Sequence, residues 1–439
     1  MITRRLAEFT SSISYSEIPS DATEMAITCF LDFLGVSLRG SGERSSRIAM
    51  KALGPGEGES TIIGHGSGAP ERAALINGIS AHNLDLDDGH RLARMHPGAC
   101  VIPAALAAAE YMDLEFRDLI TAMVAGYEAT IFMGILVNPA HRMRGFHTTG
   151  TCGAIGAAAA ASRVMGLDAD ETACALGLAA TQAAGLLESD HAGTMAKHLH
   201  AGRAAQSGII SALLASEGFT GAESAIEGRE GFLRAMSDGS DAGMPELGAF
   251  HIRGVYLKRY PVCRHLHPAL DAAADIMAAR GFMAHEIESV TVSTYDVAAE
   301  HDNYSPDTIE AVRQSLPVSL AVLLERGELS VENLQDAFDV GETASKITVR
   351  KDPLMEGCGD RRPAEVTVRL KNGEVHTCRR DLPAGEPEEP FTWEDVVEKF
   401  SRLNPGYRME KLEILQENPS VTVRELMDGL ELKQTPSDV

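Results

Sequence analysis

The sequence is poor in several features that mark other classes of protein. Aromatic residues make up only 5% of the 439 residues, whereas alanine and glycine are abundant. No apolar run approaches the roughly 18–20 residues of a membrane-spanning helix, and the basic start at residues 1–5 is not followed by the apolar stretch of a signal peptide. We therefore expect a soluble cytoplasmic protein built from closely packed helices, with no membrane partner.

Cysteine is scarce and scattered. The seven cysteines, at positions 29, 100, 152, 174, 263, 358 and 378, are odd in number and form no C-x-x-C pair. This pattern gives no support to a zinc ribbon, a redox dithiol or the cluster ligands of an iron–sulfur hydratase. The metalloprotease signature H-E-x-x-H is also missing. We expect reduced thiols and a site that uses no metal or other cofactor.

Positive charge is also in short supply. The 39 lysines and arginines are outnumbered by 63 acidic residues, which gives a formal net charge of −24. A chain this acidic is a poor candidate for binding nucleic acid or an anionic membrane, because both require a basic surface. A small anionic substrate is still compatible, since a few cations gathered in one pocket can dominate the local field.

The first part of the chain has the apolar periodicity of helices. Helices are expected over residues 24–38, 70–82, 117–136, 152–164, 168–184 and 201–218. Asp168 and Glu171 form a capping-box pattern at the start of one of them. Helices so rich in small residues can approach closely, so we interpret Gly153, Gly156 and the alanines at 157–161 as packing residues.

The pattern changes after about residue 262, where apolar and polar residues begin to alternate. Strands are expected over 290–294, 346–350 and 366–378, the last a hairpin about Asn372-Gly373, with helices over 268–280, 309–326 and 330–337. A Pro- and Gly-containing linker at 382–387 precedes two tail helices, with Thr392 and Thr422 at their starts. We predict a mostly α protein. A large all-helical domain, residues 1–260, is completed by 388–439, and residues 261–387 form a smaller α+β domain.

Four stretches bring together groups suited to acid–base chemistry or anion binding. They are the acidic stretch with Asp85, Asp87, Asp88, His90 and His96; Arg144 to Gly150, with His147; Met195 to Arg203, with Lys197, His198 and His200; and Leu257 to His267, with Lys258, Arg259, Cys263, Arg264 and His265. Buried carboxylates need partners, so the first stretch is typical of an active-site wall. The second stands before a small-residue helix, whose N-terminus would favour an anion.

Each stretch also has an ordinary structural interpretation. The acidic stretch can be a solvated loop or helix cap, a single histidine before a helix is often structural, and basic runs usually lie on the surface. The presence of all four favours a substrate with two or three carboxylates. Two chemistries compete: a divalent metal held by Asp and His, or metal-free proton abstraction next to a carboxylate. The acidic tetrapeptide is similar to a prenyl-diphosphate motif, but no second such motif occurs.

Metal-free proton abstraction builds extra negative charge on an ionised group. It therefore needs preorganised Lys, Arg and His donors, together with a base and an acid of tuned pKa. The four stretches contain this set of groups.

The same motifs, in order, resemble the MmgE/PrpD family. They are Asp85-Leu86-Asp87-Asp88 with His96-Pro97-Gly98, Gly145-Phe146-His147, residues 196–202, and Lys258-Arg259-Tyr260-Pro261. Members of that family include 2-methylcitrate dehydratase, cis-aconitate decarboxylase and iminodisuccinate epimerase. The resemblance covers nearly the whole chain. It implies a homodimer in which the α+β domain is a lid inserted into the helical domain, with the active site between the two.

The resemblance also implies roles for individual residues. Asp85, His96, His147, Lys197 and Lys258 match site residues of the family. Gly89 stands where the decarboxylases carry threonine, and Cys263 stands where their pattern has histidine. A thiol of lowered pKa could fill that role, as could His265 or His267. The expected catalytic residues are Asp85, His96, His147, Lys197, Lys258 and Cys263, and the expected substrate-binding residues are Gly89, His90, His200, Arg203, Arg259 and His267.

We favour a metal-free lyase acting on a small di- or tricarboxylate, similar to 2-methylcitrate dehydratase. In this hypothesis lysines hold carboxylates, His96 or His147 moves the proton, and Asp85 orients or tunes a neighbouring histidine. An epimerase or isomerase of an iminodisuccinate-like dicarboxylate would use the same groups, and cis-aconitate decarboxylation is a further alternative. A non-catalytic dicarboxylate binder and a metal-dependent hydrolase are the rivals from other classes.

Overall fold

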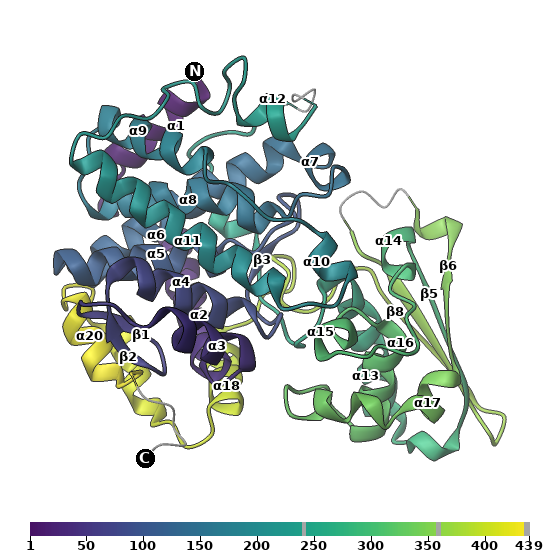
Figure 1. Cartoon of the computed structure of the whole chain (residues 1–439). Coiled ribbons are helices and arrows are strands. Elements are labelled where there is room, and N and C mark those ends of the chain that lie inside the picture. The colour runs from purple at the N-terminus through teal and green to yellow at the C-terminus, as the bar shows by residue number, and fades with distance from the viewer. Residues whose placement is uncertain (239–242, 357–360, 434–439) are drawn as a thin grey trace.

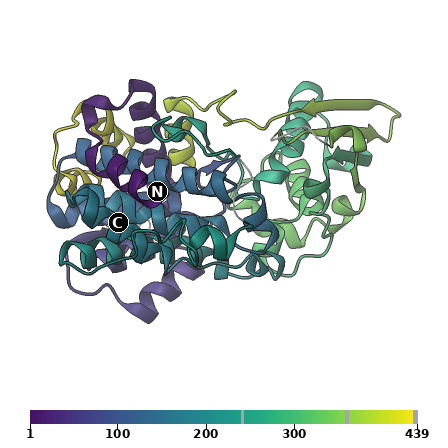
Figure 2. The ribbon, with the colours of Figure 1, turned by 90° about the horizontal axis from the view of Figure 1, so that it is seen from above.

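The computed structural model describes residues 1–238, 243–356 and 361–433. It has two parts, a larger helical region that contains the N-terminus and the tail, and a smaller α+β region (Figures 1 and 2). The helices of the helical region are α1 Ile2–Ser12, α2 Ser20–Ser41, α3 Arg44–Leu53, α4 Pro70–His82, α5 Gly98–Met112, α6 Phe116–Val137, α7 Ala140–Met143, α8 Thr148–Val164, α9 Ala169–Ala180, α10 Glu188–His191, α11 Ala196–Ser216, α12 Phe232–Met236, α18 Trp393–Leu403, α19 Ile414–Glu417 and α20 Val423–Leu430.

Small residues let the central helices of the helical region come close together. α8 packs against α6 and α11, and α11 also packs on α4. A Cβ added to Gly156 would lie 2.8 Å from the carbonyl oxygen of Gly126, and one added to Gly78 would lie 2.7 Å from the Cα of Gly202. No larger side chain fits such contacts. The packing interpretation of residues 153–161 is confirmed, because all of them are buried.

Helix α6 corrects one expectation from the sequence. It is long and apolar enough to pass the test for a membrane span, with a mean hydropathy of 1.7 over its best window, so the expectation that no run approaches that length is wrong. However, 94% of that window is buried inside the structure. The apolar surface of α6 is therefore accounted for by core packing against α8 and α5.

The α+β region is built on a four-stranded sheet. Its elements are α13 His267–Arg280, β5 Ile287–Thr294, α14 Asp296–Ala299, α15 Ile309–Val312, α16 Leu316–Arg326, α17 Gly341–Ser345, β6 Ile347–Lys351, β7 Ala364–Leu370 and β8 Val375–Arg380. The strand order is β6-β5-β7-β8, with β5 parallel to β6 and the other pairs antiparallel. Helices α13 and α16 pack on this sheet and lie between it and the helical region (Figure 1). The mostly α architecture with a mixed α+β region is as predicted.

Some expected helices are shorter or of another type. The helix expected over 309–326 is broken into α15 and α16, because the Ser315 side chain accepts the Val318 N–H and starts a new helix, with Pro317 in its first turn. The helix expected to run to residue 184 ends at Ala180. In place of the helix expected over 330–337, residues Asn333–Phe338 form a 3₁₀ helix.

The tail returns to the helical region, as expected. Thr392 accepts the Asp395 N–H and caps α18, which packs on α2. Thr422 caps α20 in the same way, and α20 packs on α5 and α6. The domain boundaries at 260/261 and 387/388 stay a prediction.

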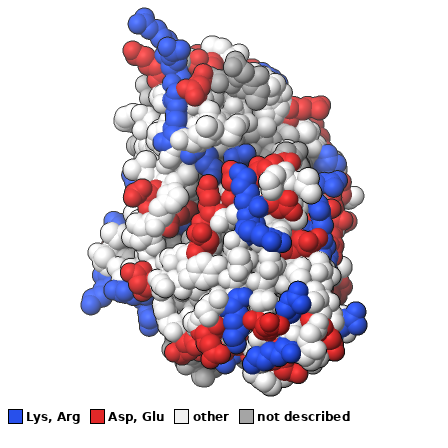
Figure 3. All heavy atoms as spheres, turned by 90° about the vertical axis from the view of Figure 1, so that its right-hand side faces the viewer, with Lys and Arg blue, Asp and Glu red and all other residues white. Residues whose placement is uncertain are grey.

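Two short antiparallel ribbons lie outside the main sheet: β1 Ser60–Ile62 with β2 Gly66–Gly68, and β3 Gly89–His90 with β4 Val255–Tyr256. The second ribbon joins the acidic stretch to the basic stretch at 257–267. Six cysteines are free, and Cys358 lies outside the described residues. On the face of the α+β region shown in Figure 3, acidic and basic side chains are interspersed.

Candidate active site

The loop that follows α4 places one buried carboxylate between two lysines. Asp85 has a φ of 52°, a left-handed conformation that few residues other than glycine adopt. Its Oδ1 lies 2.6 Å from Lys258 Nζ and its Oδ2 lies 3.1 Å from Lys197 Nζ. Although burial opposes ionisation, Lys197 and Lys258 hold the pKa of Asp85 well below its usual value. Two lysine side chains therefore converge on one carboxylate at this point.

The position of Lys197 is unfavourable for a lysine that has no anionic partner. It lies in the first turn of α11, where the helix dipole repels a positive charge. Only 12% of its side chain is exposed. Burial lowers the pKa of Lys197, but Asp85, together with Asp190, Cys263 and Asp87, raises it above its usual value.

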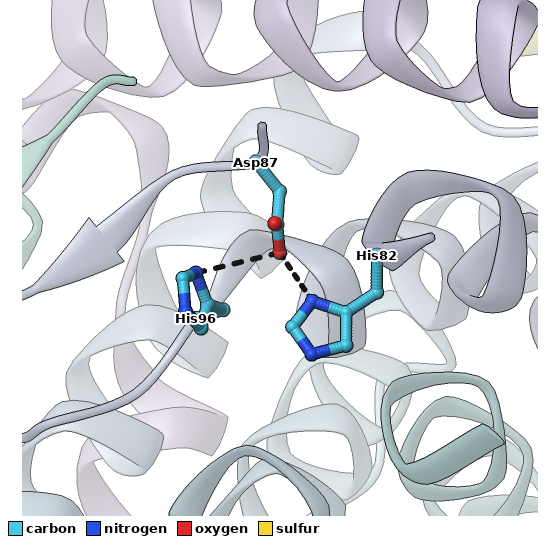
Figure 4. Close-up of side chains that lie close together, drawn as sticks. All are labelled: His82, Asp87 and His96. Atoms are coloured by element: carbon cyan, nitrogen blue, oxygen red, sulfur yellow. Dashed lines mark hydrogen bonds and ion pairs between the residues drawn. The ribbon is translucent and has the colours of Figure 1, made fainter. Parts of the chain in front are cut away.

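A second buried carboxylate, Asp87, is shared by two imidazoles. Its Oδ2 lies 2.7 Å from His82 Nδ1 and 3.5 Å from His96 Nδ1, and Figure 4 shows both rings turned toward this oxygen. Burial disfavours its charge, but His82 and His96 hold the pKa of Asp87 below its usual value. His82 Nε2 is buried without a hydrogen-bond partner, so Asp87 orients a ring whose other nitrogen is free.

The tautomer of His96 is fixed by the backbone. Its Nδ1 lies 2.6 Å from the Asp88 carbonyl oxygen, which can only accept, so Nδ1 carries the proton and Nε2 has a free lone pair. Burial lowers the pKa of His96 to about 3, despite the opposing charge of Asp87. His96 is therefore a neutral imidazole, able to accept a proton through Nε2.

Asp88 holds this loop in place through two hydrogen bonds. It accepts the N–H of Gly98, at the start of α5, at 2.9 Å and the hydroxyl of Tyr127, from α6, at 2.6 Å. Burial raises the pKa of Asp88 to about 7. We infer that its work is to hold the loop rather than to bind substrate.

His147 stands at the start of α8 as its N-cap residue, as the second stretch predicted. Its Nδ1 is 3.0 Å from His200 Nδ1, so one ring donates to the other. Its ring is stacked on that of His82 at 5.7 Å between centroids. Burial, with the neighbouring imidazoles and Lys197, holds the pKa of His147 well below its usual value, which makes it a second neutral imidazole.

The α+β region contributes a thiol, two imidazoles and an amide. Cys263 Sγ lies 3.9 Å from His301 Nε2, and His301 Nδ1 is 2.9 Å from the Gln314 carbonyl oxygen. The Gln314 side chain donates to Asp85 Oδ2 at 3.3 Å. Although burial opposes the thiolate, His301 lowers the pKa of Cys263 to about 7. The ring of His301 is stacked on that of His265.

A small pocket opens between the two regions at this point. The helical region lines it with polar and charged residues that include His82, Asp85, Asp190, Lys197 and His198, and the α+β region lines it with Glu310, Arg313 and Gln314. A carboxylate entering it would meet Lys197 and Arg313, and it would also face the carboxyl groups of Asp190 and Glu310.

His82, Asp87 and His96 could also be considered as metal ligands, because one donor atom from each lies within 4.8 Å of the others. Two features favour the hydrogen-bonded arrangement instead. Asp87 is already engaged by His82 at short distance, and the charge of Lys258 reaches both Asp87 and His96. A divalent cation would be repelled by that ammonium group.

The structure brings Asp85, His96, His147, Lys197, Lys258, Cys263 and His200 together, but it separates other residues expected to bind substrate. Arg203 is exposed and donates to Gln206, Arg259 is exposed near Asp271, and His267 is fully buried between Arg264 and the Val262 carbonyl. These three gain no support as substrate-binding residues. Their positions in a basic run carried no information on which way each side chain points.

Gly89 and His90 belong to the β3–β4 ribbon. His90 is buried, accepts the Ala93 N–H at 3.1 Å and packs on Gly254, so it too gains no support as a substrate-binding residue. A Cβ at Gly89 would overlap the ring of Tyr256. This chain therefore places a tyrosine ring over a bare backbone at Gly89, the position at which the resemblance implied threonine in the decarboxylases.

Four residues of the site were missed from the sequence: His82, His301, Arg313 and Gln314. His82 lies three residues before Asp85, and its spacing of five from Asp87 at a helix end could have been noticed. The other three are far from every motif in sequence, and no local pattern marks them.

Comparisons with known proteins identify the family. The MmgE/PrpD N-terminal domain matches residues 4–244 and the MmgE/PrpD C-terminal domain matches residues 260–418. A cis-aconitate decarboxylase-like protein, oryM, from Aspergillus oryzae is 27% identical, covering 97% of this chain and 96% of its own. Cis-aconitate decarboxylases from Aspergillus terreus and Homo sapiens are 26% and 28% identical, covering 92% and 75% of this chain and 89% and 72% of theirs. The resemblance seen in the motifs is confirmed, and the chain belongs to the MmgE/PrpD family.

Proposed function

We propose that this protein is a lyase that removes a proton next to a carboxylate of a small di- or tricarboxylate and eliminates water, as a 2-methylcitrate dehydratase does. One observation carries the proposal. Two lysine ammonium groups converge on a single buried carboxylate at 2.6 and 3.1 Å, beside imidazoles kept neutral by burial.

The lysines supply the electrostatic part of the mechanism. When a proton leaves the carbon next to a carboxylate, negative charge builds up on that carboxylate. Lys197 lines the pocket and Lys258 lies behind Asp85, fully buried. Fixed cations in a site of low dielectric stabilise such charge more than water does, and Asp85 holds both in place before substrate arrives.

His96 is assigned as the base. Its Nε2 has the free lone pair, and the imidazolium that forms is stabilised by Asp87 at 3.5 Å from Nδ1. The electron pair of the broken C–H bond forms the C=C bond, and the C–O bond to the hydroxyl group breaks. The ring of His82 lies against the rings of both His96 and His147. His147 is therefore the alternative base.

The departing hydroxyl needs a proton to leave as water, and the Cys263–His301 pair is placed to give it. His301 carries a raised pKa, because Cys263 and the Gln314 carbonyl outweigh its burial. The base, His96, belongs to the helical region and has a lowered pKa, whereas His301 belongs to the α+β region and has a raised pKa. Proton transfer by a base and an acid at one site needs such a separation of pKa values. Approach of the α+β region would align them and exclude water.

The state of Cys263 gives a prediction for pH dependence. The rate of its alkylation by iodoacetamide, followed by mass spectrometry of the labelled peptide, is expected to reach half its maximum near pH 7. The rate falls as pH drops below that value, because only the thiolate reacts. His301→Gln should move the midpoint to higher pH. A midpoint unchanged by that variant would contradict the pairing.

A second candidate function, decarboxylation of cis-aconitate, is favoured by the names of the relatives. Two features favour dehydration over it: the Tyr256 ring over Gly89, and a thiol at position 263. The epimerase alternative needs two acid–base groups on opposite faces of one carbon, and His96 and His147 would serve.

Proton NMR in deuterated buffer tests these possibilities with 2-methylcitrate, citrate, cis-aconitate and iminodisuccinate. Olefinic product from 2-methylcitrate or citrate is the expected result, unchanged by EDTA. Itaconate from cis-aconitate would instead establish a decarboxylase, and deuterium incorporation without net product an epimerase. Binding without turnover across the panel would support a non-catalytic binder, and loss of turnover with EDTA a metal-dependent enzyme.

Two further proposals follow from the resemblance alone. The homodimer can be checked by light scattering, and the cytoplasmic location by fractionation of cells.

A further inference from the structure

Three arginines that come from separate segments gather beside the candidate site. Arg94 lies in the turn between β3 and α5, Arg142 lies in α7, and Arg362 directly precedes β7 in the α+β region. Burial, together with the neighbouring charges of Arg142 and Arg362, lowers the pKa of Arg94. The three guanidinium groups therefore repel one another, and they do so across the boundary between the two regions.

None of these side chains has an ion pair within the described residues. Arg362 is only 8% exposed, and its Nη1 is buried without a hydrogen-bond partner. Its guanidinium lies 5.6 Å from the centre of the Tyr256 ring. A buried, unpaired donor on a cation is costly, and it persists where something compensates for it.

Other arginines nearby are neutralised. Arg264 lies over the same tyrosine ring at 4.4 Å, but it donates to Glu386 at 3.1 Å. Arg91 also binds Glu386, at 2.9 Å. Glu386 is thus engaged by two arginines already, although its charge still reaches Arg362. Arg94 is exposed and Arg142 is half-buried, but Arg362 is a buried cation with an unpartnered donor, so an anion from outside would complete this cluster.

The cluster adjoins the groups assigned to proton transfer. His265 is subject to the charges of all three arginines, and its Nδ1 contacts the hydroxyl of Tyr295. Its ring is stacked on His301 at 5.7 Å, and His301 in turn faces Cys263. Cys263 is influenced by Lys197 and Asp85 on its other side. A polycarboxylate extending from the lysines past Cys263 would bring a second carboxylate to the arginines.

We propose that Arg94, Arg142 and Arg362 bind a carboxylate of the substrate remote from the reacting carbon. Guanidinium groups bind carboxylates through paired, charge-assisted hydrogen bonds, and the free Nη1 of Arg362 supplies one donor. Since two arginines belong to the helical region and one to the α+β region, the bound carboxylate holds the two together. This inference rests on the proposed function and adds that the substrate has a carboxylate for this second site.

Calorimetric titration with tricarballylate tests the inference, because this tricarboxylate lacks a hydroxyl group and cannot lose water. Arg362→Gln and Arg142→Gln are each expected to weaken its binding at least about tenfold. Arg350→Gln is the matched control, since Arg350 lies in the same region and donates to Ser293; it should leave binding unchanged. Thermal unfolding of every variant shows that it is folded, and Arg142, half-buried on a short helix, is the less disruptive site.

The outcomes separate this inference from the proposed function. Equal binding by wild type and both arginine variants, with weaker binding by Lys197→Met, would overturn the arginine site and leave the lyase in place. Weaker binding by the arginine variants together with silence in the NMR panel would support the anion site and reject the lyase. Binding of inorganic phosphate but not tricarballylate by wild type would overturn the carboxylate assignment.

Discussion

Replacing Lys197 with methionine is expected to lower kcat/KM by at least about a thousandfold, which corresponds to roughly 4 kcal/mol of transition-state stabilisation. Lys197 lines the pocket, and no other lysine lines it among the described residues. The fold should survive, because Asp85 keeps Lys258 at 2.6 Å and therefore stays paired. Steady-state kinetics on the substrate identified by NMR, with thermal unfolding alongside, measure both effects.

Lys399→Met is the matched control for this variant. Lys399 forms an ion pair with Asp32 at 2.6 Å, and its side chain is 12% exposed, as is that of Lys197. It also donates to the Leu86 carbonyl at 2.9 Å, but it does not line the pocket. We expect a comparable or larger loss of stability with kcat/KM retained within a few-fold. If both lysine variants lost activity in proportion to their stability, or if Lys197→Met kept full activity, the assignment of Lys197 would be wrong.

Asp87→Asn is expected to lower kcat by about 10³- to 10⁴-fold, the range found when a carboxylate that orients a catalytic histidine is made neutral. Asp87 is shared by His82 and His96, at 2.7 and 3.5 Å. An amide oxygen accepts more weakly than a carboxylate, and it gives no charge to stabilise the imidazolium. KM should change little, because the lysines that hold the substrate are untouched.

The neighbouring residue provides the comparison. Asp88→Asn changes the same functional group one position along, but the pKa of Asp88 is raised to about 7 by burial, so the carboxyl is already partly neutral at pH 7. Its amide can still accept from the Gly98 N–H and contact the Tyr127 hydroxyl. A kcat within about tenfold of wild type is expected. Equal losses in the two variants would show that Asp87 acts only in holding the loop.

Where local signals are strong, the sequence predicts structure well. Helix α4 runs over Pro70–His82 as expected, with proline in its first turn. The Asp168 and Thr392 caps mark the starts of α9 and α18, and the hairpin forms about Asn372-Gly373. These elements depend on contacts between residues a few positions apart. The break at Ser315 is different, since the helical spacing of apolar residues, with Val312 before it and Leu316 after it, continues across it.

The candidate site likewise contains residues that local motifs predict and residues that only the fold brings in. Asp85, His96, His147, Lys197 and Lys258 were found from the sequence because they lie in compact motifs. His301 and Gln314 were not, although one faces Cys263 and the other donates to Asp85. The break between α15 and α16 brings Gln314 and Arg313 to the loop after α4, and nothing local in the sequence reports that contact.

By itself, the sequence determined the helical core, the mixed α+β region and the family, and it predicted most of the groups that gather at the candidate site. Periodicity, caps and short motifs are properties of neighbouring residues, so they do not depend on how distant segments of the chain pack. Only the tertiary structure decided which basic side chains face the site. Lys197 and Arg203 lie in one run, yet Lys197 meets Asp85 whereas Arg203 lies on the surface, because helix rotation and the packing of the two regions set the direction of each side chain.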